Sequence, residues 1–309
     1  MSDTNSLQPL TSGDVLVAST VLDDPKDDHA GRGRILQYDA NLQPKGTLWL
    51  TQTTHLVGGL ELDAQGRLWA FDSHDFKVLN IAHDGAVTVR HLPQRAFSHV
   101  NFAPDGTFLL GEHVAGSSIK PEIAARMGTK IPFMPGTERF GDGHVFRFRE
   151  DGTLVKEYAT AVHGGMGGFL GVTMSALSPD GATLVYCSET GPRLMRYDLA
   201  NDRQLPDLIS FPEGQREMFF AMAYDQAGRL LVLRGARIDA VDAEGKTTKS
   251  WPLEGFGWAV IELSRDGRHA YAGNFFTGEI AKLDLESGAK VASANVGQAR
   301  SLAGIAEVR

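Results

Sequence analysis

The sequence predicts an all-β fold, a six-bladed β-propeller with four-stranded blades. Three observations support this prediction: the composition, a recurring strand–turn–strand pattern and the positions of the turn glycines. The 309 residues include 35 Gly and 13 Pro, against 22% charged residues. This turn-rich composition is untypical of coiled coils and helical bundles. With 42% hydrophobic residues, the chain has enough apolar side chains to form a core.

The recurring pattern is a pair of apolar segments around a turn of the Asp-Gly type. Five copies lie at residues 58–72, 99–112, 174–189, 220–234 and 259–274. Each copy is interpreted as two strands joined by a glycine turn, because glycine adopts the positive φ that tight hairpins require. A second, more polar hairpin follows every copy, so each repeat carries four strands. Four-stranded units repeated around a ring are the blades of a propeller.

The sixth blade is expected to take strands from both ends of the chain. Residues 12–19 resemble a second strand with no first strand ahead of it, and residues 301–308 match the first-strand pattern of 56–62. The C-terminal strand should therefore close the first blade. Residues 1–309 are predicted to form one propeller domain, with insertions at about 21–34 and 114–142 over the channel mouth. The predicted turn glycines are Gly13, Gly66, Gly106, Gly181, Gly228 and Gly267.

Charge and segment composition argue against several classes of partner. The chain has 38 Asp and Glu, 30 Lys and Arg, and a formal net charge of −8, so it lacks the basic footprint that nucleic acids and anionic membranes select. Its N-terminus does not resemble a signal peptide, and no apolar run reaches the ~18 residues of a spanning helix. We expect a cytoplasmic protein with no obligate protein partner. The single cysteine, Cys187, is interpreted as a core residue.

One end of the central channel is the expected position of a site. The residues that end each second strand should form a polar ring there, and they can either tie blades together or perturb one another's pKa values to form a site. The ring comprises Ser19, Asp72, Glu112, Glu189, Arg234 and Asn274.

Histidines supply the candidate bases, because seven of the ten are predicted on this same face and imidazole titrates near neutrality. His99 and His163 are the candidate general bases, with Glu112 or Glu189 to orient the base and Arg234 to steady an oxyanion. Aromatic residues at the channel mouth suit an apolar or aromatic small-molecule substrate. The candidate substrate-binding residues are Asp72, His113, Phe169, Thr173, Phe220, Trp258 and Asn274.

The stretch 173–199, with its Ser-Pro-Asp-Gly turn followed by Thr-Leu-Val-Tyr-Cys-Ser-Glu, resembles the SMP-30/gluconolactonase-like group of propellers. That resemblance implies a lactonase or related hydrolase with a divalent cation, usually calcium, held by a Glu, two Asn and an Asp. The matching positions here are Ala303, Ser98, Thr173 and Phe220. None of them is a carboxylate, so we expect the usual calcium site to be absent. If a metal is bound, imidazoles would suit zinc or iron, and the candidate ligands are His55, His99, His113 and His163.

Three functions remain open from the sequence. The first is a hydrolase of a lactone or ester that uses a histidine general base, without a metal or with one divalent metal. The second is a lyase, similar in idea to the streptogramin-opening propellers, in which the same base removes a proton from a carbonyl compound. The third is a ligand-binding or scaffold propeller without catalysis.

Overall fold

The computed structural model describes residues 4–24, 30–115, 141–163, 170–188, 190–212, 215 and 217–309. These residues form 24 strands in six four-stranded antiparallel sheets. No helix occurs among them, and hence none long and apolar enough to cross a membrane. In five sheets consecutive strands pair in a meander, and in the sixth β24 pairs with β1 ahead of β2 and β3, which is the arrangement of propeller blades. The prediction of six four-stranded blades is confirmed.

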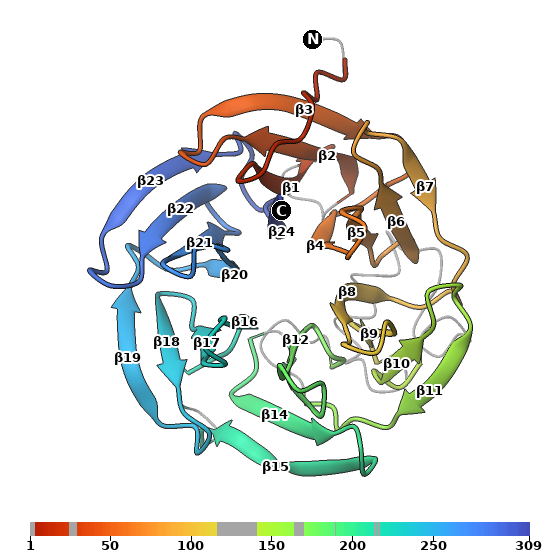
Figure 1. The fold of residues 1–309 in the computed structure, drawn as a ribbon, viewed down its shortest axis with the longest axis vertical. Coiled ribbons are helices and arrows are strands. Elements are labelled where there is room, and N and C mark those ends of the chain that lie inside the picture. Colours follow the sequence, from red (N-terminus) through yellow and green to blue (C-terminus); the bar gives the residue numbers. More distant parts are fainter. Residues whose placement is uncertain are drawn as a thin grey trace. The chain divides into compact units, whose positions relative to one another are not determined.

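The described residues divide into two compact units of three blades each. Unit 1 comprises Met1–His91 and Glu254–Arg309, and unit 2 comprises Leu92–Leu253. In unit 1 (Figure 1), blade 1 is β24 (Gly304–Glu307), β1 (Val15–Leu22), β2 (Gly31–Tyr38) and β3 (Pro44–Leu50). Blade 2 is β4 (Gly58–Leu62), β5 (Leu68–Asp72), β6 (Lys77–Ile81) and β7 (Val87–Val89). Blade 6 is β20 (Trp258–Leu263), β21 (His269–Asn274), β22 (Glu279–Asp284) and β23 (Lys290–Asn295).

Unit 2 contains blades 3, 4 and 5, each built from one continuous stretch of chain. Blade 3 is β8 (Phe97–Phe102), β9 (Phe108–Glu112), β10 (Val145–Phe148) and β11 (Leu154–Tyr158). Blade 4 is β12 (Met174–Leu177), β13 (Thr183–Cys187), β14 (Arg193–Asp198) and β15 (Arg203–Ser210). Blade 5 is β16 (Ala221–Tyr224), β17 (Leu230–Leu233), β18 (Arg237–Val241) and β19 (Thr247–Pro252).

The hairpin turns are built as the sequence predicted. All six predicted turn glycines have positive φ, between 67° and 86°. An aspartate often completes the turn: Oδ1 of Asp63 accepts from the backbone N–H of Gln65 and Arg67 at 3.0 and 2.8 Å. In blade 5, Oδ1 of Asp225 accepts the same pair of backbone hydrogen bonds at its own turn. The Asp-Gly motifs therefore act locally, since the carboxylate and the glycine fix the turn together.

The hydrophobic core lies between neighbouring blades of each unit. In unit 2, Leu194 and Val185 of blade 4 pack with Met222 and Val232 of blade 5 in one buried cluster. In unit 1, side chains of β1, β4, β5 and β24 share another. Alternate residues of a strand face opposite sides of its sheet, so an inner strand can supply both of its faces to such clusters. This explains the near-continuous apolar runs of β5, β9 and β17.

The two expected insertions have different outcomes. The first is narrower than 21–34, because Val21 and Leu22 continue the β1 ladder and pair with Arg32 and Gly31 of β2. The second interrupts blade 3 between β9 and β10, and its base is fixed by a bridge between Ala115 and Asp142. Most of this insertion, 116–140, lies outside the described residues.

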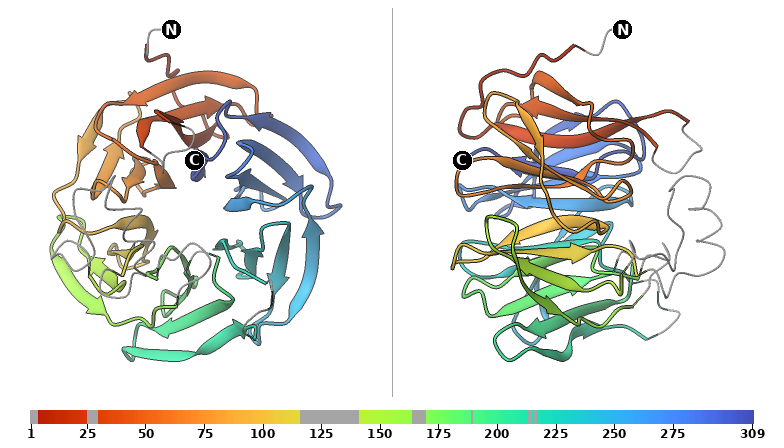
Figure 2. Two further views of the ribbon diagram at one scale, coloured as in Figure 1. Left: turned by 180° about the vertical axis from the view of Figure 1, so that it is seen from behind. Right: turned by 90° about the vertical axis from the view of Figure 1, so that its right-hand side faces the viewer.

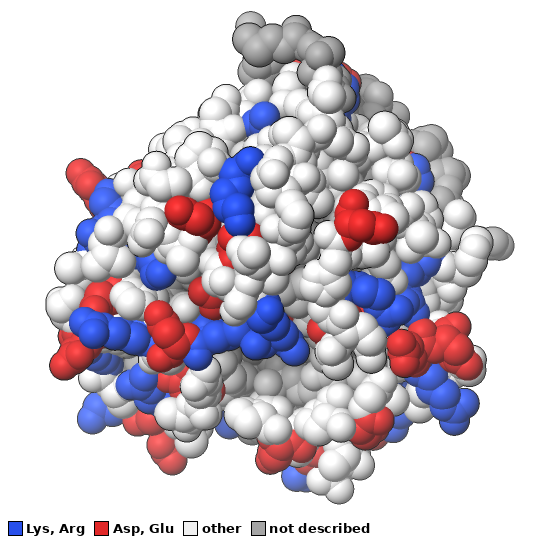
Figure 3. Space-filling view, turned by 45° about the horizontal axis from the view of Figure 1, so that its top comes forward, with Lys and Arg blue, Asp and Glu red and all other residues white. Residues whose placement is uncertain are grey.

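Charged side chains of both signs lie beside one another on the surface. On the face in Figure 3, Lys and Arg are intermixed with Asp and Glu. Several are paired in ion pairs, such as Arg193 with Asp207 at 2.5 Å and Arg147 with Asp105 at 2.7 Å. The more exposed of such pairs contribute little stability individually.

The predicted closure of blade 1 by the C-terminal strand is confirmed. β24 pairs antiparallel with β1, and the blue C-terminal end of the chain lies beside the red strands of blade 1 (Figures 1 and 2). In this ladder Val15 is paired with Glu307. Beyond the strand, the Val308 N–H donates to the Asp14 carbonyl at 2.7 Å. The closing strand is thus held by the same backbone ladder as an internal strand.

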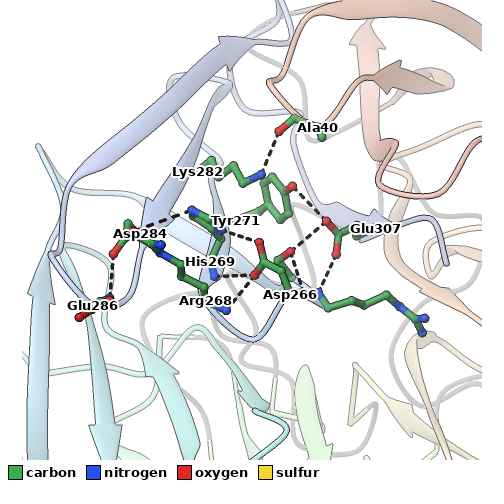
Figure 4. A network of polar contacts seen from close by, with 11 residues as sticks. Ala40, Asp266, Arg268, His269, Tyr271, Lys282, Asp284, Glu286 and Glu307 are labelled. Atoms are coloured by element: carbon green, nitrogen blue, oxygen red, sulfur yellow. Dashed lines mark hydrogen bonds and ion pairs between the residues drawn. The ribbon is translucent and has the colours of Figure 1, made fainter.

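Glu307 anchors this closing strand to blade 6 within unit 1. Its carboxylate accepts hydrogen bonds from the Ser264 hydroxyl at 3.0 Å, the Tyr271 hydroxyl at 3.2 Å and the Arg265 N–H at 2.7 Å (Figure 4). Glu307 is 8% exposed. A buried carboxylate needs such partners to offset its lost hydration, so the network fixes the end of the chain.

Candidate functional site

A chain of polar side chains joins the first strands of blades 3 and 4 in unit 2. His99 lies on β8, and its Nε2 is 2.5 Å from Oγ of Ser175 on β12. Its Nδ1 is 3.0 Å from Oγ of Ser98. His99 is 3% exposed and Ser175 is 7% exposed. The imidazole is therefore buried with a hydroxyl on each of its nitrogens.

The hydrogen-bond partners of these side chains show which atom carries each proton. The Ser98 hydroxyl donates to the Thr173 carbonyl at 2.9 Å, so its oxygen accepts from Nδ1–H of His99. The Asn101 amide donates to Ser175 Oγ at 2.7 Å, and its own oxygen accepts from the Leu177 N–H at 3.1 Å. Each hydroxyl has one proton to donate, so the Ser175 proton is directed at Nε2. The arrangement satisfies every partner when His99 is the neutral Nδ1–H tautomer.

Electrostatics favour the same neutral form. Burial, followed by the nearby charge of His113, lowers the pKa of His99 from its ordinary value of 6.5 to about 3. Removing an imidazolium from water without a carboxylate partner is costly. At neutral pH the ring therefore keeps the free electron pair on Nε2 that a general base requires.

A close approach of β9 holds the imidazole in place. A Cβ at Gly111 would lie 2.6 Å from Cε1 of His99 and 2.9 Å from Cγ1 of Val172. Because real Cβ contacts are not this short, only glycine leaves room for the ring against β9.

We expect Gly111→Ala to displace the His99 ring and to cost about 1–3 kcal/mol of folding stability, as overpacked cores do. Thermal unfolding measures the loss of stability, and the NMR shifts of the imidazole nitrogens report the broken contact to Ser175. Unchanged nitrogen shifts would contradict this account of Gly111.

Glu112, a predicted catalytic residue, holds the base of the 114–142 segment. Its carboxylate is fully buried and accepts from the N–H groups of Gly141 at 2.8 Å and Gly143 at 3.1 Å. Arg95 lies 3.5 Å away. Burial raises the pKa of Glu112 above its ordinary value, although the hydrogen bonds from the two N–H groups and the charge of Arg95 act to lower it. The contacts found for Glu112 lead to backbone and Arg95, and Ser98 is the group that orients His99.

Arg234, the predicted oxyanion stabiliser, is bound by groups of blade 5 and the preceding loop. Its Nε donates to the Met218 carbonyl at 3.0 Å, and its terminal nitrogens meet Asp239 and Glu217. Its guanidinium also lies 4.4 Å from the ring centre of Phe219. Burial lowers the pKa of Arg234, opposed mainly by the charge of Glu217. A role at an oxyanion stays a prediction.

The polar side-chain atoms of the candidate residues in unit 1 form hydrogen bonds with the backbone of nearby loops. Asp72 accepts from the N–H groups of Thr54, His55 and Asp75 at 2.9 to 3.0 Å. Asn274 accepts from the N–H groups that follow it and caps the turn into β22. Trp258 is buried, and its indole N–H donates to the Glu254 carbonyl at 3.0 Å. Asp72 and Asn274 thus hold backbone groups of neighbouring loops in place.

The remaining candidates in unit 2 are less informative. Phe220 and His113 are buried, and the Thr173 carbonyl serves as the acceptor for Ser98. His163 is half-buried at the edge of a described stretch. Glu189 and Phe169 lie outside the described residues.

No metal cluster emerges from the part of the chain that is described. None of its groups of three or more His, Cys, Asp or Glu side chains is arranged to hold an ion. His55 stacks on His74 with ring centres 5.5 Å apart, and both nitrogens of His99 are engaged by serines. The four positions carried over from the calcium-binding family offer at most hydroxyl or backbone oxygens. These residues do not fit a calcium ion, which prefers several carboxylate oxygens.

Sequence reasoning identified His99 but missed its partner Ser175 and Asn101, which donates to Ser175. A usable signal existed, because His99 and Asn101 are two residues apart on one strand and so point to the same face. Two polar side chains on one face of an inner strand indicate a polar partner on the neighbouring blade.

Comparisons with known proteins identify the fold. No protein-family model matches the chain, and no curated protein matches it in sequence. Solved structures do match: a virginiamycin B lyase from Staphylococcus aureus, with TM-score 0.53, 11% identity and coverage of 92% of this chain and 89% of that one. A streptogramin B lyase structure matches with TM-score 0.55 and 11% identity, over 94% of this chain and 91% of that one. A chain of a nidogen/laminin complex matches with TM-score 0.63 and 12% identity, over 95% of this chain and 97% of that one.

These structural neighbours are six-bladed β-propellers. The predicted fold class is thus confirmed from two sides, by the six meander sheets and by the neighbours. At such low identity the likeness extends to the fold alone, since propellers carry many unrelated functions. The narrower likeness to the SMP-30/gluconolactonase-like group is not shown by any of these matches.

Proposed function

We propose that this protein is an enzyme that hydrolyses a small lactone or ester, with His99 as general base. The observation that carries the proposal is the neutral, buried imidazole of His99, held by a serine hydroxyl on each nitrogen. Such a group can accept the proton of an attacking oxygen, a step that contributes typically 10²–10⁴-fold to a rate.

The chemistry proposed needs no ion at the calcium position of the resembled family. Ala303, Ser98, Thr173 and Phe220 offer no carboxylate there, so no step is assigned to a metal. We propose a substrate with a small reactive group, because His99 and Ser175 are nearly buried and only a narrow group can reach them. The rest of the substrate is proposed to be apolar or aromatic, because the sequence predicts aromatic residues at the channel mouth.

A lyase is the second candidate, and one comparison favours it specifically. Among the similar structures is a catalytically inactive histidine-to-alanine variant of the Staphylococcus aureus virginiamycin B lyase with quinupristin, at 13% identity and TM-score 0.56. In a lyase, His99 would remove a proton from carbon, and no water would enter the product. Hydrolysis in isotopically labelled water places solvent oxygen in the product, whereas elimination does not, so product mass distinguishes the two reactions.

The pH dependence of kcat/KM tests the assignment of His99. An ordinary histidine base with pKa near 6.5 loses activity about tenfold per pH unit below it, or about 30-fold by pH 5. The pKa of His99 is about 3, so we expect kcat/KM to stay nearly constant between pH 7 and pH 4. An acid limb near pH 6.5 that disappears in His99→Gln would contradict the assignment.

Folding must be followed over the same pH range by circular dichroism. The unfolded chain binds a proton at His99 below pH 6.5, but the folded chain does so only near pH 3. Stability from this group is therefore lost as pH falls through that window, by up to about 1.4 kcal/mol per pH unit. His99→Gln should be less sensitive to acid than the unmodified protein.

A further inference from the structure

We propose that Ser175 is a covalent nucleophile, which takes the acyl group of the substrate after His99 removes its proton. This inference rests on the proposed function and extends it, since general-base catalysis alone leaves the attacking oxygen to water. It starts from the contact between Ser175 Oγ and His99 Nε2 at 2.5 Å. A nucleophile within hydrogen-bond reach of a base that is oriented by a third group is the arrangement used by serine hydrolases of unrelated folds.

The direction of the Ser175 proton separates it from other serines of the same blades. The hydroxyls of Ser98 and Ser188 donate to backbone carbonyls, of Thr173 at 2.9 Å and of Gly171 at 2.7 Å. Those protons serve structure. The Ser175 oxygen accepts from the Asn101 amide, so its own proton is left for the basic nitrogen of His99.

The orientation of the pair is fixed on both sides. Ser98 holds the Nδ1 side of the ring, and the Thr173 carbonyl holds Ser98. Asn101 holds the Ser175 oxygen, and the Leu177 N–H holds the Asn101 amide. Because a backbone group stands at each end, the alignment of Oγ and Nε2 is built into strands β8 and β12 and does not depend on a mobile loop.

The step balances without a co-reactant other than water. Oγ of Ser175 bonds to the carbonyl carbon while its proton passes to Nε2 of His99. The bond from that carbon to the leaving oxygen then breaks, and the proton moves from Nε2 to the leaving oxygen. Water, deprotonated by His99, attacks the acyl-serine, and the returned proton restores the Ser175 hydroxyl. The net reaction converts a lactone or ester and water into an acid and an alcohol.

The absence of a carboxylate behind His99, where Ser98 stands instead, narrows the substrate class. A neutral serine stabilises imidazolium less than a carboxylate would, and the low pKa agrees with a weak base that becomes a strong acid once protonated. Such a group deprotonates serine reluctantly but readily gives the proton to a leaving oxygen. The pair therefore suits strained lactones and aryl esters, whose carbonyls are activated, and it is poorly suited to amides.

Phosphorylation by an organophosphate tests the proposal with the protein of residues 1–309. Treatment with diisopropyl fluorophosphate should add one diisopropyl phosphoryl group per chain with release of fluoride, located on Ser175 by peptide mass spectrometry. Ser175→Ala should remain unlabelled, and His99→Gln should label at least 10²-fold more slowly. Ser188→Ala is the matched control, because it removes a buried serine hydroxyl of the same blade that faces a carbonyl, and it should label at the normal rate. Ser175→Cys provides a variant of similar size, whose folding is compared by melting temperature.

The outcomes separate this proposal from the proposed function. Labelling of Ser175 together with His99-dependent ester or lactone hydrolysis supports both. Hydrolysis that needs His99 but persists in folded Ser175→Ala or Ser175→Cys, without labelling of Ser175, overturns the nucleophile and leaves His99 activating water. Labelling of Ser175 without hydrolysis of an ester or lactone supports an activated serine but contradicts the proposed substrate class. If neither labelling nor hydrolysis occurs in the folded protein, both proposals fail.

Discussion

His99→Gln is expected to lower kcat/KM for a lactone or aryl ester by about 10²–10⁴-fold, with little change in melting temperature. Glutamine has a similar length, and its amide can still bond to the hydroxyls of Ser98 and Ser175. It cannot accept a proton at neutral pH, so only the chemistry should be lost. Steady-state kinetics and thermal unfolding of the same preparations measure the two effects.

His144→Gln is the matched control for this variant. His144 lies in the same unit, and its Nδ1 pairs with the Glu157 carboxylate at 2.7 Å near the surface. Its replacement should leave kcat/KM within about twofold, because exposed pairs contribute little. If His99→Gln lowers the melting temperature while turnover persists, the buried chain of His99 and its serines is a structural network and not a catalytic one.

Deleting β24 and the residues after it, 304–309, is expected to prevent stable folding of unit 1. Ile305 and Val308 are buried in two core clusters, and burial of each such side chain is worth about 1.5–3 kcal/mol. The deletion also leaves the β1 ladder unpaired on one edge. The combined loss approaches the 5–15 kcal/mol that stabilises a typical domain. Soluble yield, circular dichroism and limited proteolysis report the result.

Two milder changes bracket this deletion. Glu307→Gln keeps the strand but weakens three hydrogen bonds to blade 6, and should cost about 1–3 kcal/mol. Thr4→Ala, near the other end of unit 1, should cost much less, because Thr4 is exposed. A truncated chain 1–303 that melts like the full protein would show that blade 1 is stable with three strands.

The fold was predictable because its signals are local. Gly66 and Asp63 lie within one turn, and their conformation follows from nearest neighbours along the chain. The pairing of β24 with β1 is not local, yet residues 301–308 repeat the pattern of 56–62 closely enough to identify it. The extent of the first insertion was harder, because Gly31 and Arg32 lack the apolar alternation by which strands are recognised.

The site was only partly predictable because its contacts cross between blades. His99 stood out as a histidine on an inner strand, but its alignment with Ser175 depends on how β8 and β12 pack, which no sequence pattern encodes directly. Glu112 and Asp72 stood out as acids at strand ends. Sequence shows their charge but does not show that backbone N–H groups of nearby loops would donate hydrogen bonds to their carboxylates.

The two-ended construction of blade 1 has a consequence for biosynthesis. Unit 2 is one continuous stretch, Leu92–Leu253, so a ribosome emits the whole of it, with His99 and Ser175, before the rest of unit 1 exists. β1 is synthesised before unit 2, whereas its partner β24 is synthesised after it. The edge of β1 that pairs with β24 must therefore stay free of other partners while blades 2 to 6 are synthesised. Nascent chains stalled before residue 304 should accordingly be the form most dependent on chaperones, because an unpaired strand edge is where chains aggregate.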